Sequence, residues 1–448
     1  MKLTKKTIAS LITLSVASAL PLSASAATSS SKIVTLNLFV ATSSSYEAPE
    51  TAMYNKVFIP EFERQNPGIK VNFSTYNSST QENTELQTSA ATHQGPSIFE
   101  FGTSMVPTAY ATNMFHVLSS RDWAMIGGKN KFFAAQLKMS GPNPSHYIGV
   151  PDMMLPFSML YNKALFRQAG ISSPPTTWTQ FVNDAKRITN PSKNQWGTVI
   201  DPEDSYDPWK VGWQLTRQMG GNFLSGNLKT ATIDSKPSIQ ALTFWFDWVT
   251  KYHIASPNDL TYKSTDAMSA FESGNIGMAI LQTATAIPSL KTSKVKNEYA
   301  FAPIPDVPFG MKSRPANGES AQTIVSGQDL AIPKYVTGAQ YTAALKWIKF
   351  FTAVKQEQMI FTHMGYLPVN KSAYSNFKAF DTPMMKAFVK SELGADPTPF
   401  SGAWGNLEVV YAGVTNSIAT QIATHTFQES NIAELLKSAD EQVQSSLQ

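Results

Sequence analysis

The 448-residue chain has no cysteine, and this absence excludes several kinds of chemistry. Without thiols, the protein has neither disulfide bonds nor thiolate metal ligands. Attachment of a lipid to a cysteine behind an export signal is excluded as well. The sequence therefore favours an exported protein that is free in the periplasm over one that is tethered to a membrane by a lipid.

Charged residues are also scarce. Lys, Arg, Asp and Glu make up 15% of the chain, against roughly 25% in ordinary globular proteins. The formal net charge of +4 falls to +1 when Lys2, Lys5 and Lys6 are removed with the leader described below. Such a balance gives no electrostatic reason to expect a nucleic-acid partner. The low charge fits either adaptation to an acidic exterior, where carboxylates lose their ionic pairings, or a composition inherited by the lineage.

Long apolar runs are missing except near the N-terminus. There, a basic stretch is followed by apolar residues from Thr7 to Leu22, which are too few for a mature membrane-spanning helix. Ala24-Ser25-Ala26 matches a small-x-small cleavage site. Residues 1–26 are therefore expected to be a secretory signal peptide, the alternative being an N-terminal anchor helix.

The length and the order of elements predict an α/β protein. Roughly 420 residues after cleavage exceed what one hydrophobic core usually fills, so two domains are expected. Apolar alternation predicts strands at Ile33–Ala41, Ile69–Tyr76 and Pro96–Phe101, with helices at Ala48–Asn66 and Thr80–Thr92 between them. This β-α-β-α-β order favours a mainly parallel sheet with helices on its faces.

The remainder of the chain is also expected to consist of short strands and amphipathic helices. Short strands are expected at Tyr147–Pro151 and Ser158–Asn162. Helices are expected at Pro237–Tyr252, Gly338–Ala353 and Ile432–Leu447, each with an apolar stripe. Neither an internal repeat nor a low-complexity domain is apparent.

Several motifs resemble those of one family. Within residues 159–189, Tyr161-Asn162-Lys163 and Ala169-Gly170-Ile171 are followed by Pro174-Pro175-Thr176-Thr177-Trp178. This stretch resembles the extracellular solute-binding proteins of family 1, the capture components of ABC importers for sugars and glycerol phosphates. Further patches resemble the family in the same order: Asn66–Val71, Pro96–Ser104, Phe271–Ile280, Phe301–Pro305 and Gly365–Tyr374. Two departures are Ser97 at a usual Asp and Met105 near a common Trp.

The resemblance implies a fold and a role. The fold is the two-lobed periplasmic-binding-protein fold (type II), with discontinuous lobes and a hinge. Expected boundaries are 32–152 with 304–353 for the N-terminal lobe, and 158–302 with 356–448 for the C-terminal lobe. The chain would cross between them near Asp152–Phe157, Pro303–Pro305 and Ala353–Gln356. The role is to bind a small carbohydrate and pass it transiently to permease subunits in the membrane, as a monomer, without catalysis and without a cofactor or metal.

A carbohydrate site needs flat aromatic faces for sugar rings and planar polar groups for hydroxyls. Loops that follow strands offer both, because open α/β sheets bind ligands at the carboxyl ends of strands. Trp209 and Trp404 are the expected stacking residues, one or both, whereas Trp178, Trp245 and Trp248 are expected in the core. The candidate ligand-binding residues are Ser45, Tyr46, Glu100, Thr103, Asp152, Trp209, Gln282, Thr283, Gly327, Gln328, Tyr366 and Trp404. Packing, capping or turn formation is the alternative role for each of them.

Three other functions compete with sugar capture. Relatives that bind glycerol phosphate carry an arginine where this chain has Ala403 and Trp404, and neither Arg217 nor Arg314 matches a phosphate motif. A secreted glycoside hydrolase would need two carboxylates across a cleft. The chain shows no nucleophile elbow, phosphate loop or metal-spaced histidine pair. A ferric-ion binder would use tyrosines, but no adjacent tyrosine pair occurs.

We predict that export releases a chain beginning near Ala27, because cleavage follows the small residues Ala24 and Ala26. N-terminal sequencing of the exported protein checks this. Recovery of intact Met1, or retention of the protein in the membrane fraction, would contradict it.

Overall fold

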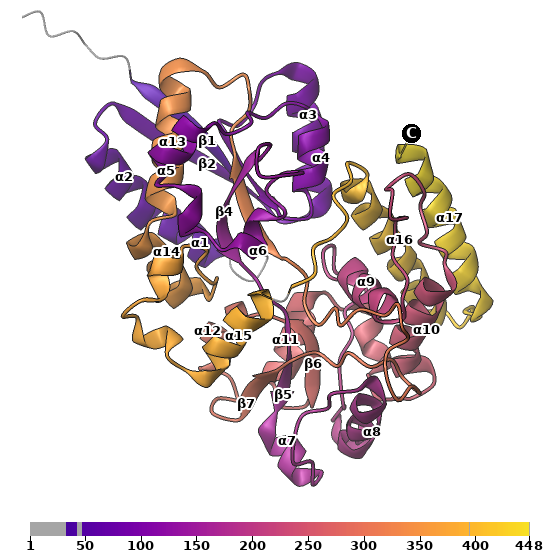
Figure 1. The fold of residues 1–448 in the computed structure, drawn as a ribbon. Helices are drawn as coiled ribbons and strands as arrows, with labels where there is room; N and C mark the ends of the chain where they lie inside the picture. The colour runs from indigo at the N-terminus through magenta and orange to yellow at the C-terminus, as the bar shows by residue number, and fades with distance from the viewer. Residues whose placement is uncertain (1–32, 43–46, 394, 448) are drawn as a thin grey trace, which may run out of the picture.

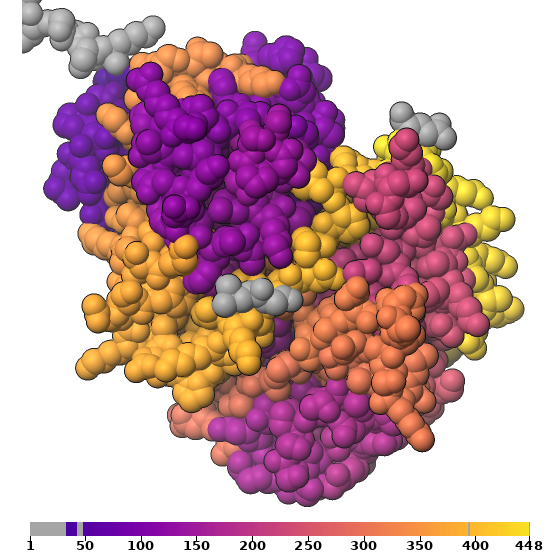
Figure 2. Space-filling model, in the orientation of Figure 1, coloured from indigo at the N-terminus to yellow at the C-terminus, as the bar shows by residue number. Residues whose placement is uncertain are grey.

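The computed structural model describes residues 33–42, 47–393 and 395–447, which form two lobes (Figures 1 and 2). The first lobe is built on a five-stranded sheet in the order β2-β1-β3-β8-β4. Its strands are β1 (Val34–Ala41), β2 (Ile69–Tyr76), β3 (Ile98–Gly102), β4 (Gly149–Met154) and β8 (Gly327–Ala331). β1 runs parallel to β2 and β3, whereas β8 is antiparallel to β3 and β4. The predicted β-α-β-α-β unit is confirmed, and β8 joins it from far along the chain.

The second lobe is built on a smaller sheet in the order β6-β5-β7. Its strands are β5 (Ser158–Asn162), β6 (Met278–Gln282) and β7 (Tyr299–Ala302), and β5 is antiparallel to both neighbours. The buried strand side chains pack under helices in a large apolar cluster that includes Trp178, Trp245 and Trp248. These three tryptophans are at most 1% exposed, so their predicted core positions are confirmed.

Helices surround both sheets (Figure 1). Those in the first part of the chain, up to β4, are α1 (Glu47–Met53), α2 (Ile59–Gln65), α3 (Ser79–Thr92), α4 (Val106–Ala111), α5 (Ser120–Ile126) and α6 (Ala134–Leu137). Those between β5 and β7 are α7 (Lys163–Gln168), α8 (Trp178–Ile188), α9 (Pro208–Gln218), α10 (Lys236–Thr250), α11 (Ser264–Glu272) and α12 (Ile287–Leu290). After β8 come α13 (Gly338–Phe351), α14 (Val354–Met364), α15 (Pro383–Leu393), α16 (Trp404–Ala423) and α17 (Ser430–Ser446). The helix expected over 48–66 is divided into α1 and α2 by a π-helical segment at Tyr54–Phe58.

Helix α8 shows how the sequence specifies such an element. The Pro174-Pro175 loop ends at Thr177, whose side chain accepts a hydrogen bond from Gln180 N–H while Gln180 reaches back to the cap. This capping box satisfies backbone donors that the first turn leaves unpaired. Trp178, Phe181 and Ile188 then lie on the buried stripe of the helix.

Three chain segments connect the lobes and are hydrogen-bonded to one another. Leu155 N–H donates to Ser326 O at 2.9 Å, and Phe157 N–H donates to Thr323 Oγ1 at 2.9 Å. The third segment pairs at Asp396, whose N–H donates to Thr323 O at 3.2 Å while its carbonyl accepts from Val325 N–H at 3.1 Å. We call residues 155–157, 323–326 and 395–398 the hinge segments.

The second and third crossings therefore both lie later in the chain than the sequence suggested. Ile304 packs in the cluster of the second lobe and Val307 pairs with Thr177, so the second crossing lies at 323–326 and not at Pro303–Pro305. Ala353–Gln356 joins α13 to α14, and both helices contribute apolar side chains to the cluster of the first sheet. α15 contributes to that cluster as well, and its Phe388 contacts Phe301 of β7 with ring centroids 4.9 Å apart. Of residues 356–448, which the predicted boundaries assign to the C-terminal lobe, α16 and α17 pack in the cluster of the second lobe.

The first lobe buries several carboxyl groups that have no basic partner. Glu100, Asp152, Asp329, Glu357 and Glu392 are each at most 1% exposed. None of them forms an ion pair within the described ranges. Burial raises the pKa of Asp152 to about 7 and that of Asp329 to about 8, and it raises the pKa values of the other three as well.

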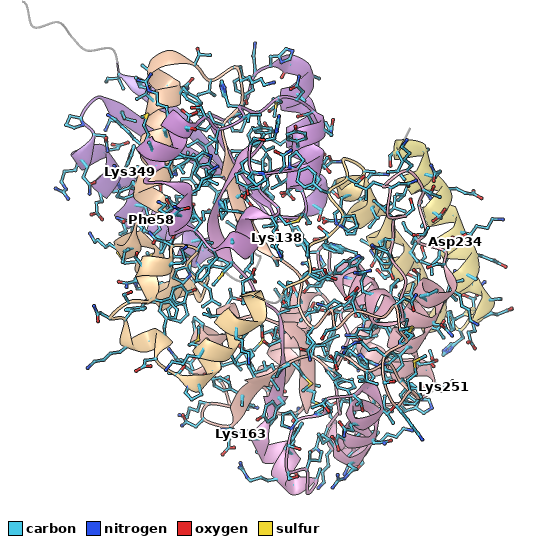
Figure 3. The ribbon with its side chains drawn as sticks, in the orientation of Figure 1. Phe58, Lys138, Lys163, Asp234, Lys251 and Lys349 are labelled. Carbon is cyan, nitrogen blue, oxygen red and sulfur yellow. The ribbon has the colours of Figure 1, made fainter. Side chains whose placement is uncertain are left out.

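Other charged residues lie at the surface. Lys163, Asp234 and Lys251, which are labelled in Figure 3, lie at the outside of the second lobe.

The buried carboxyls should make the protein less stable as pH rises. In the unfolded chain such carboxyls titrate near pH 4, whereas in the folded protein Asp152 holds its proton to about pH 7 and Asp329 to about pH 8. Their stabilising effect is therefore complete below about pH 4 and is lost as pH rises through the folded values. We expect urea denaturation to show a free energy of unfolding lower by about 3 kcal/mol or more at about pH 8 than at about pH 5.

The variant Asp329→Asn provides the test of this assignment. Asn keeps an oxygen for the Ser140 hydroxyl, which donates to Asp329 Oδ1 at 2.6 Å, but it does not titrate. Its stability should change less with pH than that of the wild type, whereas Asp381→Asn, at an exposed site, should leave the pH slope unchanged. A wild-type stability that increases from about pH 5 to about pH 8 would contradict the prediction.

Candidate functional site

A cavity of about 650 Å³ lies between the two lobes. This volume is typical of small-molecule sites, which span roughly 300–1,000 Å³. Seven of the predicted ligand-binding residues line it: Thr103, Trp209, Gln282, Thr283, Gly327, Gln328 and Tyr366. Residues that were predicted separately, most of them at strand ends, therefore come together from both lobes around one cavity.

The first-lobe wall is formed where β3 ends and β8 begins. Thr103 N–H donates to Gly327 O at 3.0 Å, and the Thr103 hydroxyl donates to Val325 O at 3.1 Å. Gln328 pairs with Gly102 in the antiparallel ladder. Because Val325 belongs to a hinge segment, this wall is attached directly to the connection between the lobes.

The second-lobe wall contains the end of β6 and the start of α9. Gln282 is the last residue of β6, and Thr283 follows it as the cap of a short 3₁₀ turn. Trp209 lies in the first turn of α9, directly after Pro208. Its indole side chain is 2% exposed, so the cavity contacts an aromatic group that is otherwise enclosed by protein.

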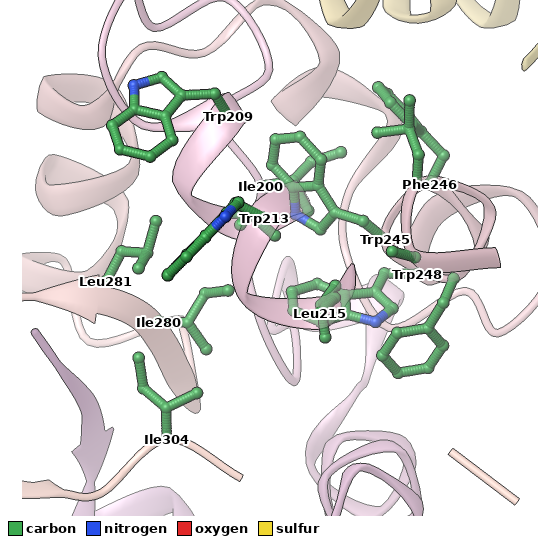
Figure 4. Close-up of a cluster of buried hydrophobic side chains, with 14 of the residues drawn as sticks. Ile200, Trp209, Trp213, Leu215, Trp245, Phe246, Trp248, Ile280, Leu281 and Ile304 are labelled. Carbon is green, nitrogen blue, oxygen red and sulfur yellow. The ribbon is translucent and has the colours of Figure 1, made fainter. Parts of the chain in front are cut away.

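Trp404 lies behind Trp209 and has no exposed surface. The two ring centroids are 5.5 Å apart with the planes at 84°, and Trp404 also stacks on Phe223 at 6.5 Å. In Figure 4, Trp209 lies at the edge of the apolar cluster, with its indole nitrogen directed away from Trp213 and Trp245. Of the two tryptophans predicted to stack on a ligand, Trp209 lines the cavity and Trp404 supports it from the core.

Four other predicted residues stand apart from the cavity surface or outside the described chain. Glu100 and Asp152 are 0% and 1% exposed and lie within the first lobe, where Glu100 accepts a hydrogen bond from Ala41 N–H at 2.8 Å. These two carboxyls are buried because the strands that carry them continue into the core. Ser45 and Tyr46 lie outside the described residues.

Several charged residues that were not predicted from the sequence also line the cavity. They are Glu82, Asp204, Asp207, Lys210, Glu272 and Glu408. Lys210 and Asp207 form an ion pair at 2.9 Å, and the Lys210 ammonium lies 5.8 Å from the centroid of Trp209. The DPWK sequence around Trp209 could have indicated this pair, because it places Asp207 and Lys210 three residues apart at a helix start.

Glu82 and Asp204 are held by dense hydrogen bonds. Glu82 Oε1 accepts from the Tyr76 hydroxyl at 2.9 Å and from Gly102 N–H at 3.0 Å. Asp204 accepts from Tyr206 N–H at 2.7 Å and from the Ser264 hydroxyl at 2.7 Å. Burial and the nearby Glu408 carboxylate raise the pKa of Glu82 to about 8, and burial raises that of Glu408 to about 7.

The arrangement is suited to recognition of hydroxyl groups. Carboxylates, amides and threonine hydroxyls supply directional hydrogen bonds, and Trp209 supplies an apolar face. Within the described ranges, no group of three or more His, Asp or Glu side chains is placed to hold a metal ion. A search of the same residues found no helix with the length and apolar character needed to span a membrane.

Structural comparison shows the same fold in solute-binding proteins. The maltose-bound MalE3 of T. maritima superposes with a TM-score of 0.76 at 20% identity, over 91% of this chain and 99% of that one. A solute-binding protein of an ABC transporter from Agrobacterium radiobacter K84, in complex with ribitol, gives a TM-score of 0.77 at 19% identity, over 92% and 99%. The chain thus has the two-lobed fold of these proteins.

Sequence comparison identifies the family. A binding protein of Brucella abortus (strain 2308) is 24% identical over 299 residues, which are 65% of this chain and 67% of that protein. The model of the bacterial extracellular solute-binding proteins matches residues 58–387, from the residue before helix α2 to the first half of α15. This chain belongs to the bacterial extracellular solute-binding protein family.

Proposed function

We propose that this protein captures a neutral carbohydrate or polyol in the interlobe cavity and delivers it to an ABC importer. The observation that carries the proposal is a cavity of about 650 Å³ in which Trp209 lies among amide, hydroxyl and carboxylate groups from both lobes. Maltose and ribitol, the ligands of the two structural relatives, fit this chemistry because both present many hydroxyl groups. The role is binding without catalysis, by a monomer in the periplasm that contacts its permease transiently.

The charge of the cavity favours a neutral ligand over a phosphorylated one. Five carboxyl side chains line the cavity, and Lys210 is the only basic side chain among the described lining residues. Asp207 already pairs with Lys210 at 2.9 Å. Arg217 pairs with Asp396, and Arg314 with Asp306, and neither arginine lines the cavity. Phosphate recognition calls for free arginine groups or a preformed set of backbone amides.

A calorimetric screen tests the proposal. We expect micromolar or tighter binding, about 8 kcal/mol or more, for at least one member of a panel of monosaccharides, disaccharides, oligosaccharides and polyols. Ligand at about 100 times its dissociation constant should stabilise the fold by about 2.7 kcal/mol. Glycerol phosphates should not bind, and a hydrolysis assay should detect no product. A panel without a single binder would refute carbohydrate capture.

Replacing Trp209 with alanine should weaken binding of the ligand about fivefold. Stacking contributes about 1 kcal/mol beyond burial, and burial of the indole face adds little because Trp209 is only 2% exposed in the ligand-free protein. Because Trp209 is 2% exposed and packs on Trp404, the variant should also lose stability. Affinity must therefore be measured by calorimetry well below the melting temperature, with the folded fraction determined by circular dichroism.

Two controls separate stacking from packing. Trp209→Phe keeps an aromatic face and should recover much of the affinity. Trp245→Ala removes a side chain from the same apolar cluster that does not line the cavity. It should cost about 3–5 kcal/mol of stability, while the folded protein retains its affinity. Normal binding by Trp209→Ala would show that the indole is only a packing group.

A further inference from the structure

Two carboxyl groups meet the cavity from opposite lobes. Glu82 comes from α3 of the first lobe, and Glu408 comes from α16 of the second. The two helices are in contact, and each side chain is 3% exposed while lining the cavity. The pair therefore lies where the lobes meet and where a bound molecule would displace the remaining water.

Buried polar atoms around this pair lack partners. Glu82 Oε1 accepts two hydrogen bonds from its own lobe, but Glu408 Oε1 has no hydrogen-bond partner among the described residues. The indole N–H of the neighbouring Trp209 is likewise unpaired within that part of the chain. Buried polar atoms without partners are costly and uncommon in native proteins. Because Glu408 and Trp209 both line the cavity, an acceptor and a donor without partners lie close to the space that a polar ligand would fill.

The surrounding charges do not neutralise two carboxylates. Lys210 is the cation that acts on both Glu82 and Glu408, and it is already paired with Asp207 and influenced by Asp204. Among the described residues, the other titratable groups facing the pair are the hydroxyls of Tyr76 and Tyr206, which carry no positive charge. Ser104 and Trp404 are neutral neighbours of Glu408. Burial raises the pKa values of both carboxyls, and Glu408 raises that of Glu82 further, so the pair retains a proton at neutral pH.

We propose that Glu82 and Glu408 form a hydroxyl-binding subsite across the lobes and that ligand capture is accompanied by uptake of a proton by this pair. This inference rests on the proposed carbohydrate function. With one proton, the pair presents both an O–H donor and carboxylate acceptors, so it can bind neighbouring hydroxyls of one ligand. Displacement of water by the ligand disfavours a second negative charge, so the proton is held more tightly in the complex. The proton comes from solvent and returns to it on release.

The coupling between proton binding and ligand binding determines how the affinity for the ligand changes with pH. A complex that holds an additional proton binds its ligand more tightly as pH falls. Burial raises the pKa of Glu408 to about 7, and burial together with the nearby Glu408 raises that of Glu82 to about 8 in the ligand-free protein. We therefore expect the dissociation constant of the strongest binder in the carbohydrate and polyol panel to rise by up to about tenfold per pH unit above about pH 7.

Calorimetry with maltose, ribitol and the rest of the panel, in buffers of different ionisation enthalpy, measures the proton uptake directly. The wild type should take up protons near pH 7 to 8. Glu82→Gln keeps an oxygen for the Tyr76 and Gly102 donors but cannot titrate. This variant and Glu408→Gln should bind at pH 6 within a few-fold of the wild type and should lose the pH slope. Glu85→Gln, one turn further along α3, should keep that slope.

An infrared measurement tests the pair without a ligand. The wild type at pH 7 should show a protonated-carboxyl band that Glu82→Gln or Glu408→Gln diminishes and Glu85→Gln does not. Binding that is independent of pH, or a pH slope that both glutamine variants retain, would overturn the inference while leaving the carbohydrate function intact. Absence of binding by every sugar and polyol would overturn the function, and the infrared bands would then show whether the pair still shares a proton.

Discussion

The hydrogen bonds among the three hinge segments are the constraint on which the rest of the structure depends. Residues 323–326 lie between the other two segments and bond to both, so the chain passes between the lobes as a small ladder instead of three separate loops. The same segment accepts the hydroxyl of Thr103 through Val325 O. The first-lobe wall of the cavity is thereby fixed to the hinge, and a movement of one lobe must be carried by these few backbone bonds.

The second wall depends on a layered aromatic packing. Trp404 has no contact with solvent. It makes an edge-to-face contact with Trp209 and stacks on Phe223. Close packing of this kind limits the movement of a cavity side chain as effectively as a hydrogen bond does. The sequence indicated that both tryptophans sit between turn-forming residues, but it could not rank them. Their order in depth is set by the contact of α16 with α9, which is a tertiary feature.

Local patterns predicted the strands and most helices because period and turn residues are local signals. β1, β2 and α3 appear within one or two residues of their expected limits, and seven of the predicted ligand-binding residues line the cavity. The second and third crossings were misplaced, because nothing local distinguishes the end of a strand before Pro303 or a helix junction at Ala353 from a passage between lobes. Glu82 was missed for a similar reason. It lies in STQENTELQTSAAT, a helix of very low apolar content that resembles a solvent-exposed one, and it is buried by tertiary contacts with the ends of β2 and β3 and with α16.

The buried carboxyls suggest a physical reason for the low content of charged residues in the sequence. Side chains such as Asp152, Asp329, Glu82 and Glu408 are enclosed without enough cations to neutralise them. A protein built in this way is expected to lose stability when the pH rises above the raised pKa values of these groups, which are about 7 to 8. The buried carboxyls of the first lobe make the stability of the fold depend on pH. The proposed pair of Glu82 and Glu408 makes ligand binding in the cavity depend on pH. Fold stability and ligand capture then respond to pH in the same direction, because both depend on protons held where water has been excluded. A lineage-wide preference for uncharged residues would account for the sparse surface charge, but it would not account for acidic side chains being placed in the interior.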